Sequence, residues 1–168
     1  MIINGESLTT SGIDWTKTGF ITQERYDESP EIMLKPDDIL LSKDGTIGKI
    51  GYITSLKFPT TVASGIFVIR NSMKGEYGAP FLYYLLESNR FKGFVKGRIE
   101  GSVIPHLYQK DFVDFTFPKP NPDELKRFND FSQPIFKMIQ NNLQENRHLE
   151  EVRDRLLPKL LSGEIEIK

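Results

Sequence analysis

The feature of this sequence that most constrains its fold is a long helical pattern in the last third of the chain. After a proline-rich joint, "PKPNPDEL", selected positions recur at alternating intervals of four and three residues. These positions are Ile135, Ile139, Asn142, Asn146, Leu149, Arg153, Leu156 and Leu160. Such spacing is typical of a helix that presents one stripe to a neighbouring helix. A helix of roughly 35 residues would be ~50 Å long, longer than a small domain is wide.

The start of this helix is marked by the tetrapeptide "NPDE" at 121–124. The asparagine can accept free amide protons of the first turn, the proline suits the first helical position, and the two acids face the positive end of the helix dipole. We predict a helix from this cap to about residue 157. Pro134 is expected to kink or interrupt it, and Pro158 is expected to disturb its end.

Two arrangements are open to such a helix. It can fold back as part of the core, or it can project from the preceding domain and pair with another helix. Asn142 and Asn146 favour pairing, because buried asparagines fix the register of paired helices at some cost in stability. We expect the helix to project and to pair.

The preceding part of the chain, residues 1–118, has the pattern of short strands and turns with one helix. An Asp-Gly pair between apolar runs, at Lys43-Asp44-Gly45-Thr46, predicts a β-hairpin, because glycine accepts the positive φ of the turn. The strands are expected at 38–42, 48–54, 65–70 and 112–118, and the helix, packed on the sheet, at 79–95. The sequence therefore predicts an α+β fold with two parts: a mixed domain over 1–118, and a linker and long helix over 119–168.

Composition narrows the class of protein. The chain contains no cysteine, which leaves neither disulfides nor a thiol nucleophile. No run approaches the ~18 apolar residues of a membrane span, and the N-terminus lacks the pattern of a signal peptide, so we expect a cytoplasmic protein without a membrane partner. The net charge is −1, but residues 39–118 hold 10 basic and 6 acidic residues. This basic middle can form a nucleic-acid face or only a solvated surface.

The sequence contains no assembled catalytic motif. The segment from Gly45 to Lys49 is too short for a phosphate-binding loop and is followed by a strand pattern rather than a helix. His106 and His148 lie in different elements without metal-ligand spacing. The acids of Pro36-Asp37 and Glu124-x-Lys126 are too far apart in sequence to indicate a nuclease. We predict no enzyme activity, no metal and no cofactor.

The remaining candidate for function is the stretch "RFKGFVKGRIEGSVIPHLYQKDF" at 90–112. Residues 90–98 hold four cations and no acid, interleaved with two phenylalanines. Cations at this density can neutralise phosphates, and the glycines allow close approach of the backbone. The same residues can equally be the C-terminal end of a helix, where cations interact favourably with the helix dipole, followed by an ordinary loop.

Four stretches in this order resemble one known family. "DDILLSKDGTIGKIGYI" at 37–53, "GSVIPHL" at 101–107, "FPKPNPDEL" at 117–125 and "LEEVRDRLLPKLLSGEIEI" at 149–167 are similar to the specificity subunits of type I restriction–modification systems. The resemblance runs from roughly residue 15 to the end. It implies a non-catalytic, sequence-specific DNA-binding subunit of mixed α/β fold. Such subunits direct methyltransferase and restriction subunits, which supply the S-adenosylmethionine and ATP chemistry, to a bipartite DNA target.

The chain departs from the family pattern in two respects. Complete members have two recognition domains and two long helices paired antiparallel, whereas this chain has one of each. Recognition domains of the family also begin earlier, so the first strands are expected to be absent or replaced, and the domain shortened at its N-terminus. We therefore expect a homodimer through an antiparallel coiled coil, whose contact residues are Ile135, Ile139, Asn142, Asn146, Leu149 and Leu156.

The candidate contacts with double-stranded DNA come from charge and turn placement. They are Lys43, Thr46, Lys49, Lys92, Lys96, Arg98, Ser102, His106 and Lys110. The lysines are expected to meet phosphates, and Arg98, Ser102 and His106 to reach base edges. The low net charge and the expected shortening leave an alternative: a module that docks on the methyltransferase without binding DNA.

Overall fold

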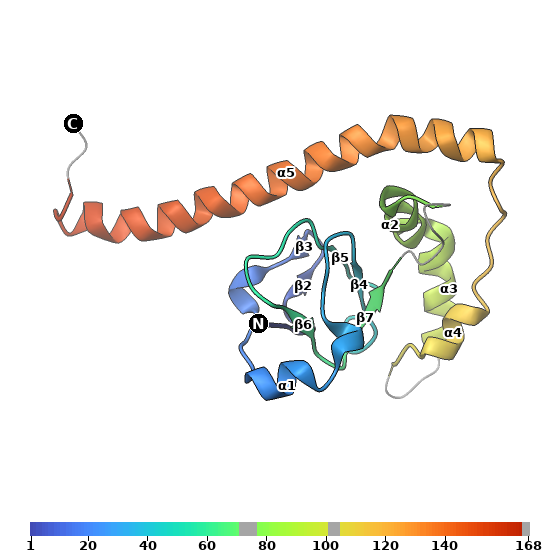
Figure 1. Ribbon diagram of the computed structural model, residues 1–168, viewed down its shortest axis with the longest axis horizontal. Helices are drawn as coiled ribbons and strands as arrows, with labels where there is room; N and C mark the ends of the chain where they lie inside the picture. Colours follow the sequence, from blue (N-terminus) through green and yellow to red (C-terminus); the bar gives the residue numbers. More distant parts are fainter. Residues whose placement is uncertain (71–76, 101–104, 166–168) are drawn as a thin grey trace. The chain divides into compact units, whose positions relative to one another are not determined.

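The central strand of the larger sheet is β4 (Ile39–Ser42), all four residues of which are buried. In the computed structural model, β4 pairs antiparallel with β5 (Ile50–Tyr52) along one edge and with β7 (Ile66–Ile69) along the other (Figure 1). The predicted hairpin is confirmed by the β4–β5 pair, in which Leu41 lies opposite Ile50. The three strands are shorter at their ends than the apolar runs that predicted them.

Both faces of β4 are covered by hydrophobic clusters. Leu40 belongs to a cluster that otherwise contains Ile3, Leu8, Leu34, Ile53, Val62 and Ile66. Ile39 and Leu41 point the other way, into a cluster with Ile50, Leu86, Phe91, Val95 and Leu107. Because successive side chains of a strand point to opposite faces, a strand with apolar neighbours on both sides has a continuous apolar sequence. The stretch "ILLS" has this pattern.

Two small strand pairs contribute to the Leu40 side. Strand β1 (Ile2–Ile3) pairs parallel with β6 (Thr61–Val62), and β2 (Leu8–Thr9) pairs antiparallel with β3 (Gly12–Ile13). Three short helices follow β3 along the chain: η1 (Trp15–Lys17), α1 (Gln23–Asp27) and η2 (Pro30–Ile32).

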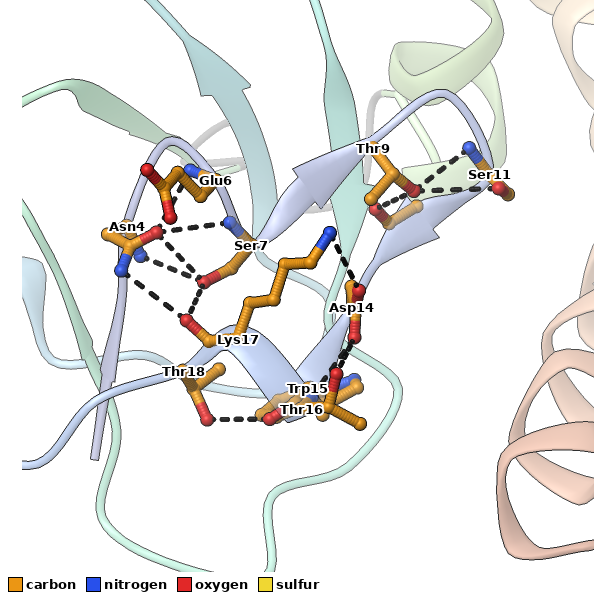
Figure 2. A network of polar contacts seen from close by, with 11 residues as sticks. Asn4, Glu6, Ser7, Thr9, Ser11, Asp14, Trp15, Thr16, Lys17 and Thr18 are labelled. Carbon is orange, nitrogen blue, oxygen red and sulfur yellow. Dashed lines mark hydrogen bonds and ion pairs between the residues drawn. The ribbon is translucent and has the colours of Figure 1, made fainter. Parts of the chain in front are cut away.

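The N-terminal turns are held by side-chain hydrogen bonds (Figure 2). The Asn4 side-chain oxygen accepts from the backbone N–H of Glu6 at 2.9 Å and of Ser7 at 3.1 Å. The buried Ser7 hydroxyl donates to the Lys17 carbonyl at 3.0 Å. Asp14 caps η1, and the hydrogen bond from the Thr16 hydroxyl lowers the pKa of the Asp14 carboxyl. These bonds satisfy polar groups that the strand pairs leave free.

An ion pair with a buried carboxylate ties the loop before β4 to the end of β7. Asp38 is 2% exposed, and Arg70 Nε donates to its Oδ1 at 2.7 Å. The same guanidinium donates from Nη1 to the Glu31 carbonyl at 2.8 Å, and the hydrogen bonds to Asp38 raise the pKa of Arg70. The buried carboxylate is thus fully compensated, as buried charges require.

The single helix predicted over 79–95 is wrong, because the structure contains two helices there. Helix α2 (Ala79–Glu87) ends at Ser88, and α3 (Asn89–Ile99) begins directly after it. The Ser88 backbone is extended, and its side chain accepts from the Phe91 N–H at 3.2 Å. A serine that caps a new helix interrupts the old one while the apolar spacing continues. Leu86, Phe91 and Val95 still reach the core on the Ile39–Leu41 side.

The strand predicted over 112–118 is also wrong. Helix α4 (Gln109–Val113) occupies its start, and the chain then continues without regular structure. The Tyr108 N–H donates to the Asp111 carboxylate at 2.7 Å, which begins a helical turn. The alternating phenylalanines are half-buried by ring packing instead: the Phe112 ring centre lies 5.1 Å from that of Phe67, and the Phe115 ring centre lies 5.0 Å from that of Phe91.

Helix α5 (Pro122–Leu161) is the long C-terminal helix. The predicted cap is confirmed, since the Asn121 side chain accepts from the Asp123 N–H at 2.9 Å. The predicted interruption at Pro134 is not observed, and the helix also runs through Pro158. Each proline removes one N–H donor, and the carbonyls that lose it belong to residues exposed to water.

The structure describes residues 1–70, 77–100 and 105–165. The chain divides into two units, Met1–Asn129 and Asp130–Lys168. The first is a mixed α/β unit that includes the first turns of α5, where Phe128 packs against α2; the second is the rest of that helix and the end of the chain. None of the helices in the described part is long and apolar enough to cross a membrane.

Gly51 provides a test of the packing between β5 and the β2–β3 pair. A Cβ at this position would lie 2.7 Å from Ile13 Cγ1 and 2.8 Å from Leu8 Cδ2. We expect Gly51→Ala to lower the free energy of unfolding by about 1–3 kcal/mol through overpacking, measured by urea denaturation. Gly93→Ala is the matched control, because its Cβ meets nothing within 4 Å and helix propensity predicts a gain of roughly 0.5–1 kcal/mol. Equal effects of the two substitutions would contradict the close packing at Gly51.

Candidate nucleic-acid interface

The β4–β5 loop, residues 43–49, presents three of the predicted contacts. It is closed by Ser42, which is 1% exposed. The Ser42 hydroxyl donates to the Thr46 carbonyl at 2.7 Å and accepts from the Lys49 N–H at 2.9 Å. Gly45 and Gly48 have φ of 63° and 91°, which L-residues with a side chain rarely adopt. Lys43, Thr46 and Lys49 are therefore held on a loop with a defined backbone.

A second segment, residues 105–107, lies along this loop. Asp44 and His106 form an antiparallel bridge between backbones that are 62 residues apart. The Leu107 N–H donates to the Lys43 carbonyl at 3.0 Å, and His106 Nδ1 is bonded to the Asp44 carboxylate. The structure thus brings Lys43 and His106 together, although they are far apart in sequence.

The backbone of Gly65 completes the junction. The Lys43 N–H donates to the Gly65 carbonyl at 2.9 Å, and a Cβ at Gly65 would lie 3.3 Å from the Asp44 carboxylate. Lys43 also places its ammonium nitrogen 4.7 Å from the centre of the Phe67 ring. Three chain segments therefore fix the position of Lys43 and Asp44 at the end of β4.

The predicted cations of α3 lie in different surroundings. Lys92 pairs with Glu87 at 2.6 Å. Arg98 pairs with Asp114 at 2.8 Å and lies 3.8 Å from Asp111. Within the ranges that the structure describes, the Lys96 side chain is exposed and has no carboxylate partner.

Arg98 links α3 to the second loop segment through α4. Asp111 accepts from the Tyr108 N–H and faces Arg98, and Tyr108 lies beside His106 with ring centres 4.4 Å apart. Lys110 places its ammonium nitrogen 5.2 Å from the centre of the Tyr108 ring. A chain of contacts therefore runs from Arg98 to the β4–β5 loop. Ser102, also a predicted contact, lies outside the described residues.

Two residues of this cluster were missed by sequence reasoning. The sequence pattern places Asp44 only in the turn and gives no signal at Tyr108. An acidic turn residue carries no sequence signal of a partner 62 positions away. A lone tyrosine before a short helix is likewise an ordinary feature of a sequence. Among the described residues, no group of three His, Asp or Glu side chains is arranged to hold a metal ion.

The predicted dimerisation residues all lie on α5. Ile135, Ile139, Leu149 and Leu156 are between 41% and 57% exposed, and Asn142 and Asn146 are exposed as well. Phe131 and Met138, which were not predicted, are 73% and 63% exposed; Phe131 lies four residues before Ile135, and Met138 lies between Ile135 and Ile139. The stripe is thus a row of exposed apolar side chains with two asparagines at its middle.

Comparison with known proteins identifies the family. Residues 2–151 match the family described as the type I restriction modification DNA specificity domain. The chain belongs to this family. The specificity component of type I systems is non-catalytic. The match begins at residue 2 and so includes the N-terminal stretch, earlier than the resemblance from residue 15 indicated.

Curated relatives match this specificity domain along nearly its whole length. The type I restriction enzyme MjaIX specificity subunit of Methanocaldococcus jannaschii is 28% identical over 159 residues, which cover 94% of this chain and 36% of the relative. The MjaVIII specificity subunit of the same organism is 24% identical over 162 residues, covering 93% and 37%. The chain thus spans less than half the length of the curated relatives it matches and corresponds to a half-length specificity subunit.

Two solved structures share the fold of the specificity domain. One comes from a study of the complex assembly and conformational transition of a type I R-M system. It has a TM-score of 0.59 and 13% sequence identity, and the match covers 98% of this chain and 43% of the chain in that structure. The other is the HsdS subunit from Thermoanaerobacter tengcongensis, with a TM-score of 0.56, 13% identity, and coverage of 96% and 42%. The resemblance to type I specificity subunits, predicted from the four sequence motifs, is confirmed.

Leu107 is the side chain that anchors the second loop segment to the core. It is 0% exposed and lies in the cluster that contains Ile39 and Leu41. We expect Leu107→Ala to lower the free energy of unfolding by about 2–5 kcal/mol, as for other buried leucines, in urea denaturation. Tyr108→Ala, next in sequence but 54% exposed, should change it by no more than about 0.5 kcal/mol. A similar loss of unfolding free energy in both variants would contradict the interpretation that Leu107 anchors the segment while Tyr108 lies on the surface.

Proposed function

We propose that this chain is the sequence-specific DNA-binding specificity component of a type I restriction–modification system. The observation that carries the proposal is the family match over residues 2–151. The component has no catalytic role of its own. It directs methyltransferase and restriction subunits to a bipartite target in double-stranded DNA, and those subunits bring the S-adenosylmethionine and ATP chemistry. It needs no cofactor and acts in the cytoplasm.

The proposed DNA face consists of two parts within residues 1–118. The first is the β4–β5 loop with the segment at its side: Lys43, Thr46, Lys49, His106 and Lys110. The second is α3 with Lys92, Lys96 and Arg98; Ser102 completes the candidates. The lysines contact phosphates and supply affinity, whereas Arg98, Ser102 and His106 reach base edges. Since Arg98 already pairs with Asp114 and Lys92 with Glu87, DNA must compete with these carboxylates.

The second part of the proposal concerns residues 119–168. Two copies of the chain pair through α5 as an antiparallel coiled coil, and the dimer takes the place of one full-length subunit. The half-length coverage of the relatives and the exposed stripe on α5 support this. Asn142 and Asn146 set the register at the middle of the pair. Two identical readers related by a two-fold axis read an inverted repeat with a spacer.

A second candidate function is favoured by the carboxylates beside the predicted cations. Glu87, Asp111 and Asp114 offset the charge of Lys92 and Arg98. In this alternative the chain docks on the methyltransferase through α5 without binding DNA. A titration of a labelled mixed-sequence duplex at low salt separates the two, because only the DNA reader binds. Selection from a random duplex library should then recover an inverted repeat.

The first test of the proposed DNA face concerns the α3 cations. Lys92→Ala combined with Lys96→Ala should weaken binding to every duplex and flatten the dependence of log Kd on log salt by about 0.9 for each phosphate that is no longer neutralised. Fluorescence anisotropy over a salt series measures both quantities. The control is Lys126→Ala with Lys137→Ala, which removes the same charge from α5. An unchanged slope in the α3 variant, or an equal change in the control, would remove this face from the proposal.

The second test concerns the oligomeric state. The wild-type chain should sediment as a dimer at micromolar concentration, and Leu149→Asp with Leu156→Asp should convert it to a monomer, because charge on the stripe opposes pairing. Leu161→Asp is the control, since Leu161 is 80% exposed and lies outside the repeat. Circular dichroism checks that α5 remains helical. A monomeric wild-type chain would contradict the paired-helix proposal.

A further inference from the structure

Tyr108 is the exposed aromatic residue that the loop cluster holds at its surface. Its side chain is 54% exposed, although the residue before it, Leu107, is 0% exposed. The Tyr108 N–H is fixed by the Asp111 carboxylate at 2.7 Å, and the Leu107 N–H by the Lys43 carbonyl at 3.0 Å. The backbone that carries the ring is therefore anchored on both sides.

The ring itself is supported by two neighbours. The His106 ring centre lies 4.4 Å away at a tilt of 59°, and the Lys110 ammonium nitrogen lies 5.2 Å from the ring centre. A tyrosine has few rotatable bonds and offers a large contact area, so it loses little conformational entropy when it is bound. The supported ring of Tyr108 has still less freedom to lose.

The charges around the ring favour a polyanion. His106 and Lys110, which lie against the ring, and Lys43, on the adjoining loop, can donate to phosphates, and two carboxylates of the cluster are engaged within it. Asp44 is bonded to His106, and Asp111 is bonded to the Tyr108 N–H and faces Arg98. An apolar ring among cations has the composition of a surface that binds both the backbone and the less polar parts of a nucleic acid.

We propose that the Tyr108 ring makes an apolar contact with double-stranded DNA, to a deoxyribose or a thymine methyl group, and that the Asp44–His106 pair positions it. The inference rests on the proposed DNA-binding function and adds to it a residue whose contribution is not electrostatic. Asp44 acts as a positioning residue: its bond to His106 sets the ring on which Tyr108 rests. Thymine methyl groups and sugars are the apolar surfaces that side chains meet in the grooves.

The salt dependence distinguishes this contact from a charge contact. Tyr108→Ala should weaken binding roughly 5- to 150-fold, the effect of removing an aromatic side chain that stacks on a single-stranded base, and by the same factor at every salt concentration. Tyr108→Phe should retain wild-type affinity, because the ring and not the hydroxyl makes the contact. Lys110→Ala is the matched control and should lower the slope of log Kd against log salt. All are measured by anisotropy with one mixed-sequence duplex and with the duplex recovered by selection.

Asp44→Ala tests the positioning role by the sign of its effect. Removing a carboxylate from a DNA face would strengthen binding by charge alone. If the Asp44–His106 pair positions Tyr108, the substitution weakens binding instead, and the weakening disappears when Tyr108 is already alanine. Stronger binding by Asp44→Ala would overturn the positioning role, and additive effects in the double variant would do the same.

A duplex with uracil in place of thymine identifies the source of the contact. If wild-type affinity falls and that of Tyr108→Ala does not, the partner is a methyl group; if neither changes while Tyr108→Ala still binds weakly, the partner is a sugar. Unchanged affinity of Tyr108→Ala, or a changed salt slope in that variant, would overturn the inference while wild-type binding keeps the proposed function. Absence of wild-type binding at low salt would instead count against the proposed function itself.

Discussion

The structure of the first unit depends on the burial of β4 from four directions. It pairs with β5 and β7 along its edges, and its side chains enter hydrophobic clusters on both faces. A strand confined in this way cannot slip by one residue, because a slip would exchange the two faces. The end of β4 is consequently fixed in place. The loop that starts there, with Lys43 and Asp44, is therefore also held in a defined position. The second loop segment is then placed by its own bonds to that loop.

The sequence was sufficient for the features that local chemistry determines. The Asp44-Gly45 turn, the apolar run of β4 and the cap at Asn121 each act within a few residues, and each was found in the structure. The errors came from competition between neighbouring signals. Ser88 ends one helix by starting another, and Asp111 turns a run that alternates like a strand into a helix. At the candidate site, the loop could be predicted but the Asp44–His106 contact could not, since it depends on how the whole sheet brings distant segments together.

The charge pattern of the proposed interface explains why the net charge of the chain is a poor guide to it. Arg98 and Lys92 are each held by a carboxylate, whereas Lys96 has none among the residues that the structure describes. Paired cations contribute less to non-specific attraction but keep a defined direction. For the proposed DNA reader, this arrangement would favour orientation over general affinity. Part of the basic balance of residues 39–118 is thus taken up by ion pairs, of which that of Arg98 joins α3 to α4 and Asp114.

The way in which Ser42 closes the β4–β5 loop has a consequence for evolution. The hydroxyl of a residue that is 1% exposed carries the hydrogen bonds that shape the loop, so the frame is built from atoms inside the protein. The side chains of Thr46 and Lys49 take no part in those hydrogen bonds, whereas Gly45 and Gly48 hold backbone positions with a positive φ. Substitutions at Thr46 and Lys49 would therefore change the outer surface of the loop and leave the hydrogen bonds of Ser42 in place, so that one scaffold can carry different surfaces.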